Sequence, residues 1–461
     1  MFINKQSPSR VKPVFKTARK DGNLSPGLYH FRKTDQDNDS RLHLRIDPDG
    51  TGTLVINASS ILHLNPTAAM ITYFHLKGFP QNLIKNKIDE VFDLVDEMID
   101  RDIELITADL DGFINANGKP VLTQSGVEIN TPFSRHPTAP YRMDLAITYR
   151  CNNDCSHCYN ARQRSYPELP TADWKRIIDR LWDLNIPHLI FTGGEPTLRD
   201  DLIELIEYAE AKGQITGLNT NGRKLSDPAY VKKLVKAGLD HIQITVESHD
   251  QGIHDDMVSS TGAWKQTISG VKNALESPLY VMTNTTMLQN NQDTLGKTLD
   301  FLADIGVPTI GLNALIYSGR GKNVGTGLPE NDLTDLLKIA QEKTQKAEQK
   351  LIWYTPTLYC QFNPLEMDLG IKGCTAALYN MCIEPDGGVL PCQSYYSQLG
   401  NILDNSWKSI WEHELALQLR TRSNIPGECQ TCSLLEECGA GCPLSYIDQP
   451  RIIDPYIPPP S

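Results

Sequence analysis

Residues 143–158 read MDLAITYRCNNDCSHC, an apolar run at 143–149 followed by Cys151, Cys155 and Cys158 in the spacing CxxxCxxC. Three thiolates on one short loop can bind three irons of a [4Fe-4S] cube and leave the fourth iron open to another ligand. The alternative is a zinc loop, but structural zinc sites usually pair one CxxC with a second CxxC or with two histidines. The spacing therefore favours a cluster whose open iron binds a reacting cofactor.

The apolar run at 143–149 is the first of six units in which a strand precedes a helix. Strands are expected at residues 143–149, 188–192, 215–220, 241–247, 279–287 and 308–316. Pro170-Thr171 opens the first helix, and apolar side chains recur along one face of it at Trp174, Ile177, Ile178, Leu181 and Trp182. Repeated units of this kind imply a parallel sheet with right-handed crossovers, and such barrels bind ligands at the carboxyl ends of their strands.

A second motif, Thr192-Gly193-Gly194-Glu195-Pro196, follows the apolar strand at 188–192. The glycines let a ligand approach the backbone, and Glu195 supplies an acceptor for an ammonium group. Alone, the motif is only a turn between a strand and a helix, but it should share a rim with the cysteine loop because both follow strands. Together, CxxxCxxC and GGEP resemble the radical S-adenosylmethionine (radical SAM) superfamily, in which the methionyl amino and carboxylate groups chelate the open iron.

Short polar side chains end three further strands and suit hydrogen bonds to a ribose or a substrate, although each is also a common turn or cap residue. The resemblance implies contacts to the ribose or the methionyl carboxylate, and the expected cofactor-binding residues are Gly193, Gly194, Glu195, Asn219, Asn221, Thr245, Glu247 and Asn284. His157 stands where the family usually has an aromatic residue near the adenine.

The resemblance also implies the chemistry. An electron delivered to the cluster on Cys151, Cys155 and Cys158, the expected catalytic residues, would cleave S-adenosylmethionine into methionine and a 5′-deoxyadenosyl radical. That radical would remove a hydrogen atom from the substrate. The cofactor performs the difficult step, while the protein orients it and excludes water and oxygen.

Composition limits the partners and the compartment. The 461 residues should form two or three domains, and 44 basic against 56 acidic residues, a net charge of −12, argue against binding to nucleic acid or anionic membranes. Residues 1–10 contain no apolar signal region, and no stretch approaches the length of a membrane-spanning helix. A cytoplasmic protein is expected. Because the cytosol keeps thiols reduced, its eleven cysteines should be metal ligands rather than disulfides.

The C-terminal third contains the other eight cysteines, which are Cys360, Cys374, Cys382, Cys392, Cys429, Cys432, Cys438 and Cys442. Cys374, twelve residues, Gly387, four residues and Cys392, followed by CxxCxxxxxCxxxC at 429–442, resemble the SPASM extension, which binds auxiliary iron-sulfur clusters. The turn at 385–388 reads PDGG between two short apolar strands, and this hairpin should return Cys392 toward Cys374.

One cysteine of the full SPASM pattern is missing, because none follows Cys442. The resemblance implies an inner auxiliary cluster on Cys374, Cys392 and Cys442, with Cys360 as a candidate fourth ligand. An outer cluster would use Cys429, Cys432 and Cys438, completed by a carboxylate such as Asp448 or Asp454. A single auxiliary cluster is the alternative. Cys382 is expected to be structural, since it alternates with Glu384 on a strand where any small side chain would serve.

The N-terminal segment has a different pattern. Strands are expected at 27–32, 41–46 and 53–56, followed by helices at 66–76 and 88–101. The stretch LHLNPTAA at 62–69 resembles the PqqD-type module, a small winged-helix fold that binds the leader of a precursor peptide as an added strand at a sheet edge. A purely structural domain is the alternative.

These features predict an α/β chain: a partial (β/α)6 TIM-like barrel with an N-terminal winged-helix-like α+β domain and a small Cys-rich C-terminal domain. We expect a PqqD-like peptide-recognition domain at 1–110 and a linker rich in Gly, Asn, Thr and Pro at 111–140. The radical SAM core should occupy 141–345 and the SPASM domain 346–461.

A leader-binding module beside a SPASM domain favours an enzyme that modifies a ribosomally made peptide with S-adenosylmethionine and two or three [4Fe-4S] clusters. Its partners would be the precursor peptide leader and a flavodoxin or ferredoxin-type reductant. The first alternative is an enzyme that acts on a small molecule or tetrapyrrole, for example by side-chain decarboxylation in a modified heme pathway. The second is a non-catalytic electron-transfer protein, which GGEP and the open CxxxCxxC argue against.

Overall fold

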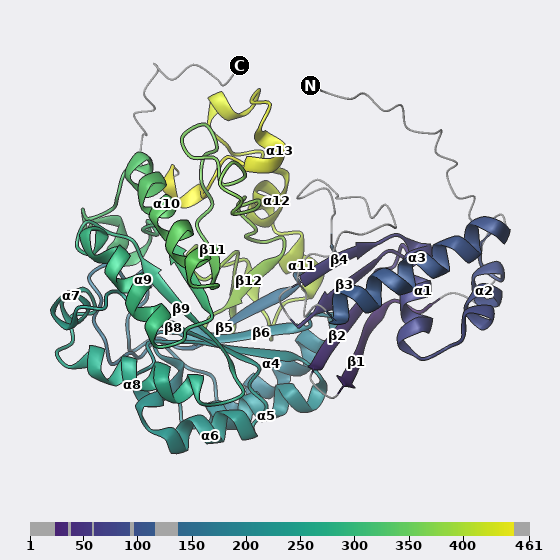
Figure 1. The fold of residues 1–461 in the computed structure, drawn as a ribbon, viewed down its shortest axis with the longest axis horizontal. Helices are drawn as coiled ribbons and strands as arrows, with labels where there is room; N and C mark the ends of the chain where they lie inside the picture. The colour runs from purple at the N-terminus through teal and green to yellow at the C-terminus, as the bar shows by residue number, and fades with distance from the viewer. Residues whose placement is uncertain (1–23, 36–37, 58–59, 93–95, 116–136, 447–461) are drawn as a thin grey trace. The chain divides into compact units, whose positions relative to one another are not determined.

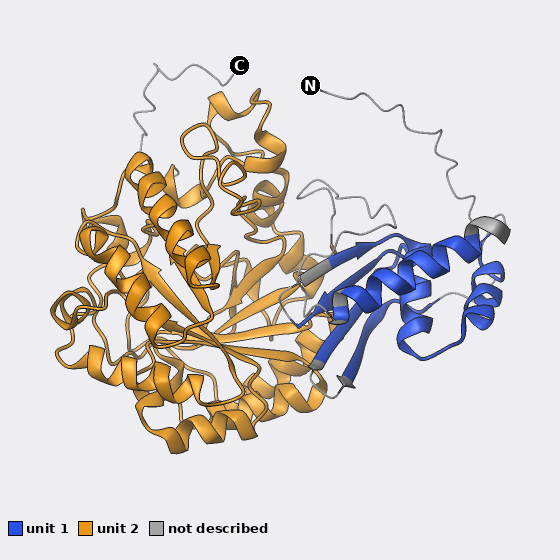
Figure 2. Cartoon of the chain, in the orientation of Figure 1, with its two compact units in different colours: residues 1–130 blue, residues 131–461 orange. Residues whose placement is uncertain are grey.

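The computed structural model describes residues 24–35, 38–57, 60–92, 96–115 and 137–446. These residues belong to two compact units, one within residues 1–130 and one within 131–461 (Figure 2). The segment expected to be a linker, 111–140, lies largely outside the described residues. At its start, helix α3 (Asp96–Asn115) continues past the expected domain boundary at residue 110.

The second unit is built on the parallel sheet that the sequence predicts (Figure 1). Its first six strands lie side by side in chain order: β5 (Arg142–Thr148), β6 (His188–Gly193), β7 (Ile215–Thr220), β8 (His241–Thr245), β9 (Tyr280–Thr286) and β10 (Thr309–Asn313). A seventh parallel strand, β11 (Lys350–Trp353), pairs with β10 and was not expected. Its apolar run comprises only Leu351, Ile352 and Trp353, which is shorter than the pattern of a recognisable strand.

Helices connect these strands and bury one apolar face against them. They are α4 (Thr171–Asp183), α5 (Leu202–Lys212), α6 (Pro228–Lys236), α7 (Gln251–Met257), α8 (Ala263–Leu275), α9 (Leu295–Asp304) and α10 (Glu330–Lys346). In α4, Trp174, Ile177, Ile178 and Leu181 are fully buried in the core shared with the strands, as predicted, whereas Trp182, expected on the same face, is only partly buried. Each such side chain contributes about 1.5–3 kcal/mol of burial free energy. This packing holds the strand ends, and hence the rim, in place.

The Cys-rich region shares the barrel's sheet. Strand β12 (Asn380–Ile383) pairs in parallel with β5, and the hairpin continues through β13 (Gly388–Leu390) and β14 (Gly400–Asn401). The hairpin is therefore as predicted. Its first strand also covers the edge of the barrel sheet at β5, whose backbone groups would otherwise lack partners. Short helices follow at α11 (Trp407–Trp411), α12 (Glu414–Thr421) and α13 (Leu435–Cys438).

The first unit is an antiparallel sheet with three helices. Its strands lie side by side in chain order: β1 (Gly27–Asp35), β2 (Asn38–Ile46), β3 (Gly52–Ile56) and β4 (Ser60–Leu64). Leu42, Leu44 and Leu54 of the sheet pack against Ala69 of helix α1 (Pro66–Leu76) and Leu110 of α3. Three strands and α1 agree with the prediction, whereas β4 was read only as part of the LHLNPTAA motif.

The prediction of one helix at 88–101 is wrong. Residue 88 lies near the end of α2 (Gln81–Asp89), and α3 begins at Asp96. Ile84 and Ile88 of α2 pack in the same apolar cluster as Ile99 and Ile103 of α3. The two helices therefore carry apolar residues whose spacing looks like one continuous pattern in the sequence. No helix in the described ranges is both long and apolar enough to cross a membrane.

Candidate active site and metal centres

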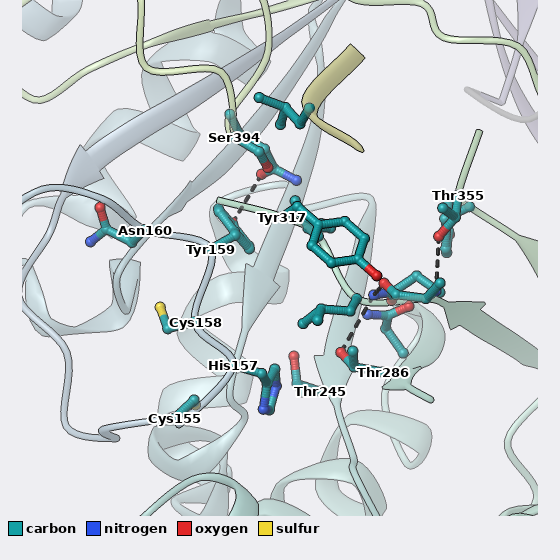
Figure 3. A pocket seen from close by; sticks show the side chains of 18 of the residues that line it. Cys155, His157, Cys158, Tyr159, Asn160, Thr245, Thr286, Tyr317, Thr355 and Ser394 are labelled. Carbon is teal, nitrogen blue, oxygen red and sulfur yellow. Dashed lines mark hydrogen bonds between the residues drawn. The ribbon is translucent and has the colours of Figure 1, made fainter. Parts of the chain in front are cut away.

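The cysteine loop follows β5 and is held by hydrogen bonds from distant residues. Arg164 donates to the carbonyl of Cys151 at 2.9 Å, and the backbone N–H of Arg320 donates to that of Cys158 at 2.9 Å. The loop also docks on the end of α7, where the N–H of Asp154 donates to the carbonyl of Val258 at 2.9 Å. The three thiols therefore sit on a braced segment at the rim, and Figure 3 shows two of them, Cys155 and Cys158, beside the cavity.

Their environment suits a bound cation. Burial, with smaller contributions from the charges of Glu195 and Cys158, raises the pKa of Cys151 to about 11. Burial also raises the pKa values of Cys155 and Cys158, and Cys155 is affected in addition by the other two thiols. Three crowded thiols that resist ionisation in the bare protein become thiolates when iron balances their charge. The donor set of three soft sulfurs fits an iron-sulfur cluster.

The two glycines after β6 let the backbone pack on this loop. A Cβ on Gly193 (φ +131°) would lie 2.0 Å from the carbonyl oxygen of Thr148, and one on Gly194 would lie 2.4 Å from that of Arg150. The N–H of Gly194 donates to Thr148 O, and the N–H of Glu195 to Arg150 O, both at 2.8 Å. The two glycines thus let the backbone after β6 pack closely on the start of the cysteine loop. Both glycines also line the cavity.

Glu195 is fully buried and does not line the cavity. Its carboxylate accepts hydrogen bonds from Thr220 Oγ1 at 2.7 Å, from the N–H of Asn221 at 2.8 Å and from Thr197 Oγ1 at 2.6 Å. The sequence suggested an ammonium acceptor at this position. In the structure this carboxylate instead joins the end of β6 to the end of β7, so it shapes the rim through its neighbours.

One cavity of about 1150 Å³ lies at the carboxyl ends of the strands. It brings together most of the residues that the sequence proposed: Cys151, Cys155, Cys158, Gly193, Gly194, Asn219, Asn221, Thr245, Glu247, Asn284, Cys374, Cys392 and Cys442. Pockets for a single small ligand usually measure about 300–1000 Å³, so this one has room for a nucleoside cofactor and part of a substrate.

The buried polar atoms on the cavity wall that have no hydrogen-bond partner within the described part of the chain include Asn284 Oδ1 and His157 Nδ1. Buried polar groups are nearly always satisfied, so these atoms indicate a ligand in the cavity. The other ring nitrogen of His157, Nε2, lies 3.0 Å from Oε1 of Glu247, and Glu247 Oε2 accepts from the N–H of Thr286 at 2.9 Å. These orphaned atoms and the polar strand ends fit S-adenosylmethionine.

Sequence reasoning missed two contributors to the site. Arg320 and Tyr317 lie between β10 and α10 and line the cavity, and Figure 3 shows the Tyr317 ring projecting beside it. Arg320 also donates to the carbonyl of Asp154 in the cysteine loop at 2.9 Å. Neither residue belongs to a motif, so only the fold shows that their segment returns to the cysteine loop.

The auxiliary cysteines divide into two places. Cys374, Cys392 and Cys442 line the cavity, and the hairpin returns Cys392 toward Cys374, since the N–H of Ala377 donates to the carbonyl of Pro391 at 2.8 Å. The cavity lining does not include the remaining candidates Cys360, Cys429, Cys432 and Cys438. Cys382 is fully buried and packs with Tyr149 and other apolar side chains, and it does not line the cavity.

This fold and site define a radical SAM protein with an auxiliary-cluster region. The model of the radical SAM superfamily matches residues 145–302, and that of SPASM, an iron-sulfur cluster-binding domain, matches residues 374–433. The chain therefore contains a radical SAM domain followed by a SPASM domain. It is an enzyme that uses S-adenosylmethionine and [4Fe-4S] clusters.

Similar proteins act on different substrates. The AdoMet-dependent heme synthase of Methanosarcina barkeri is 27% identical over 321 residues, which cover 66% of this chain and 91% of that protein. The PqqA peptide cyclase of Bradyrhizobium diazoefficiens is 27% identical over 316 residues, covering 66% and 81%. The crystal structure of Streptococcus suis SuiB bound to precursor peptide SuiA has a TM-score of 0.67 at 16% identity and covers 91% of this chain and 97% of that one. The likeness to SuiB shows a shared fold.

Proposed function

We propose that this enzyme modifies a ribosomally made peptide, forming a carbon-carbon, thioether or similar crosslink. The observation that carries the proposal is the first unit, a separate antiparallel sheet with an edge strand, in a chain whose other unit already has its own core and cavity. Catalysis on a free small molecule needs no such module. A peptide enzyme uses one to hold the leader while the core of the peptide reacts.

Strand β1 suits the addition of a peptide strand. It pairs with β2 along all nine of its residues and forms one edge of the sheet among the described residues. Tyr29 and Phe31 pack against Tyr73 of α1, with ring centroids 4.8 and 6.2 Å apart, so the strand is held firmly on one face. An anchored edge strand offers backbone N–H and C=O groups that an extended peptide can pair with.

The relatives support two substrate classes. SuiB was solved with its precursor peptide, and the PqqA cyclase is named for its peptide substrate. The heme synthase favours a tetrapyrrole, which is the second candidate, and its match covers the same 66% of this chain as that of the PqqA cyclase. A tetrapyrrole enzyme would give the first unit no role in substrate binding, and this difference makes the two candidates separable.

Within the cavity, Cys151, Cys155 and Cys158 would hold the reactive cluster, and Asn219, Asn221, Thr245 and Asn284 would bind S-adenosylmethionine with the backbone of Gly193 and Gly194. When bound, the cluster and S-adenosylmethionine would supply a 5′-deoxyadenosyl radical that abstracts hydrogen from the substrate. Nε2 of His157 lies 3.0 Å from Oε1 of Glu247, which leaves Nδ1 for a hydrogen bond with the cofactor. A flavodoxin or ferredoxin-type protein would supply the electron.

The test compares two substrates with the same reconstituted enzyme. Peptides encoded by short reading frames beside its gene, and an iron tetrapyrrole with propionate side chains, are each incubated anaerobically with S-adenosylmethionine and a reductant. We expect one peptide to lose two hydrogens per crosslink in its mass spectrum while the tetrapyrrole stays unchanged. Loss of carbon dioxide from the tetrapyrrole, with every peptide unchanged, would overturn the proposal in favour of the second candidate.

A further inference from the structure

The eight C-terminal cysteines are not distributed as the family pattern implies. The pattern assigns Cys360 to the inner group and leaves the outer group one thiol short. In the structure, the inner cysteines Cys374, Cys392 and Cys442 line the large cavity, and Cys360 does not. Cys360 therefore lies outside the cavity that the inner cysteines line.

The segment that carries Cys360 contacts the outer group. Cys438, the last residue of α13, is buried, and its Sγ accepts from the N–H of Tyr359 at 3.4 Å and donates to the carbonyl of Thr357 at 3.5 Å. The segment 357–359 thus lies directly on the Cys438 thiol, and Cys360 is the next residue along the chain, with consecutive Cα atoms about 3.8 Å apart. Leu358, Tyr359 and Cys438 form one apolar cluster, with Cys429 packed against it.

The local backbone fixes this arrangement. The N–H groups of Gln361 and Phe362 both donate to the carbonyl of Leu358 at 2.9 Å, which closes a turn around Cys360. The hydroxyl of Tyr359 accepts from the N–H of Lys372 at 2.8 Å, so the turn is anchored on its buried side. Cys360 itself is exposed. It therefore sits on a rigid turn at the surface of the outer group.

We propose that Cys360 is the fourth ligand of the outer auxiliary cluster, together with Cys429, Cys432 and Cys438. The inner cluster then has three cysteine ligands, Cys374, Cys392 and Cys442, and one iron that takes a non-cysteine ligand from the cavity. Among the described residues, no three Cys, His, Asp or Glu side chains converge as they would around a single ion. A cube binds each thiolate through a different iron, so its ligands surround a volume rather than a point. The inference is independent of whether the substrate is a peptide.

Alkylation of thiols tests the assignment in the intact, reconstituted protein. An exposed cysteine that is not a ligand reacts with iodoacetamide, whereas an iron-bound thiolate is protected. We expect Cys360 to stay unmodified in the holoprotein, as judged by peptide mass spectrometry, and to react once iron is removed with a chelator. Rapid modification of Cys360 in protein that retains all of its iron would overturn the proposal.

Two double variants then identify the cluster to which Cys360 belongs. In Cys429→Ala/Cys432→Ala the outer cluster is removed, and Cys360 should become reactive. In Cys374→Ala/Cys392→Ala the inner cluster is removed, and Cys360 should stay protected. The reverse result would assign Cys360 to the inner cluster and refute the proposal.

Iron content gives a second readout that does not depend on alkylation. Cys360→Ser should lower bound iron and change the electron paramagnetic resonance signal of one auxiliary cluster, and it should have no additional effect in the Cys429→Ala/Cys432→Ala background. Because Cys360 is exposed, the substitution should leave folding intact. Asp448→Asn and Asp454→Asn remove the carboxylates that would otherwise complete the outer cluster, and we expect neither to change iron content. Loss of iron with either, and not with Cys360→Ser, would overturn the assignment.

Discussion

Arg162, four residues after Cys158, donates two hydrogen bonds to Glu384 on the C-terminal hairpin, Nε to Oε1 at 2.7 Å and Nη2 to Oε2 at 2.9 Å. Glu384 is fully buried, and the hydroxyl of Tyr149 donates to it as well at 3.1 Å. The pair joins the loop that carries the reactive cysteines to the hairpin that carries Cys392. The two cluster regions are therefore joined by this ion pair, whose carboxylate is fully buried and whose guanidinium is partly exposed.

Removing one partner of this pair should destabilise the protein. Arg162→Met leaves a buried carboxylate with only one remaining side-chain donor, and breaking a buried pair in this way costs about 3–5 kcal/mol. We expect a lower midpoint of urea unfolding of the iron-free chain. The control is Arg176→Met, which removes an exposed pair with Asp173 and should change the unfolding free energy by less than about 1 kcal/mol. Equal effects of the two substitutions would show that the buried pair does not brace the loop.

The cysteine loop is tested by replacing Cys151, Cys155 and Cys158 together with Ala. If these thiols hold the reactive cluster, the variant should form no 5′-deoxyadenosine from S-adenosylmethionine and should bind about four fewer irons per chain. The auxiliary iron should remain, because its ligands lie on other segments. Cofactor cleavage that survives the triple substitution would contradict the assignment. The matched control is Cys382→Ala, which removes a packed thiol and should leave iron content unchanged.

Asn284 is expected to bind the cofactor through its unsatisfied side-chain oxygen. Asn284→Ala should weaken the binding of S-adenosylmethionine about tenfold, the effect of one lost hydrogen bond of about 1.4 kcal/mol. Isothermal titration under anaerobic conditions measures the change. Asn273→Ala is the control, because the Asn273 amide donates to the carbonyls of Leu225 and Ser226 and does not line the cavity. Equal affinity in Asn284→Ala and the parent would remove Asn284 from the site.

Hydrogen exchange tests the edge of the first sheet. When the leader of a peptide substrate binds as an added strand, N–H groups along the outer edge of β1 should pair with it. These N–H groups should then exchange at least about tenfold more slowly. The amides of β2, which lies between β1 and β3, serve as the internal control and should not change. If a peptide is modified while β1 exchanges at its free rate, the leader binds elsewhere.

The partly buried imidazole of His241 gives stability a specific pH dependence. Its ring packs on Gly217, where a Cβ would lie 2.3 Å from Nε2, and burial lowers the pKa of His241 from 6.5 to about 4. The unfolded chain therefore binds the proton more tightly, so stability from this group is present above pH 6.5 and is lost as the pH falls toward 4. We expect the iron-free chain to lose about 2 kcal/mol between pH 7 and pH 5 through this group. In His241→Gln, urea unfolding at both pH values should show a smaller loss.

Local patterns predicted the parts of this protein that depend on local chemistry. The six βα units follow from apolar runs and helical periodicity, because a strand and an amphipathic helix each show their buried face within a few residues. The hairpin before Cys392 follows from the turn PDGG in the same way. In the first unit, α2 and α3 were merged, since both carry apolar residues toward one cluster and the residues between them showed no clear break.

The candidate site, like the fold, was predicted where it depends on local patterns. Strand ends supplied the predicted cofactor-binding residues that line the cavity, because parallel strands place their carboxyl ends on one rim. Arg320 and the Arg162–Glu384 pair were not predicted, because their partners lie far away in the sequence and neither belongs to a motif. Glu195 was expected at the cofactor, but its buried partners on β7 are visible only in the folded chain.

The sequence by itself determined the chemistry: three cysteines on one loop, glycines where the backbone must pass closely, and eight further cysteines in the C-terminal third. Spacing along the chain is enough for such groups when the ligands share a loop. Tertiary structure decided which distant residues meet, namely that the hairpin completes the barrel sheet and that Cys360 lies with Cys438 rather than with Cys374. That choice depends on how the segment 357–362 packs on α13, and no local pattern encodes a contact across almost eighty residues.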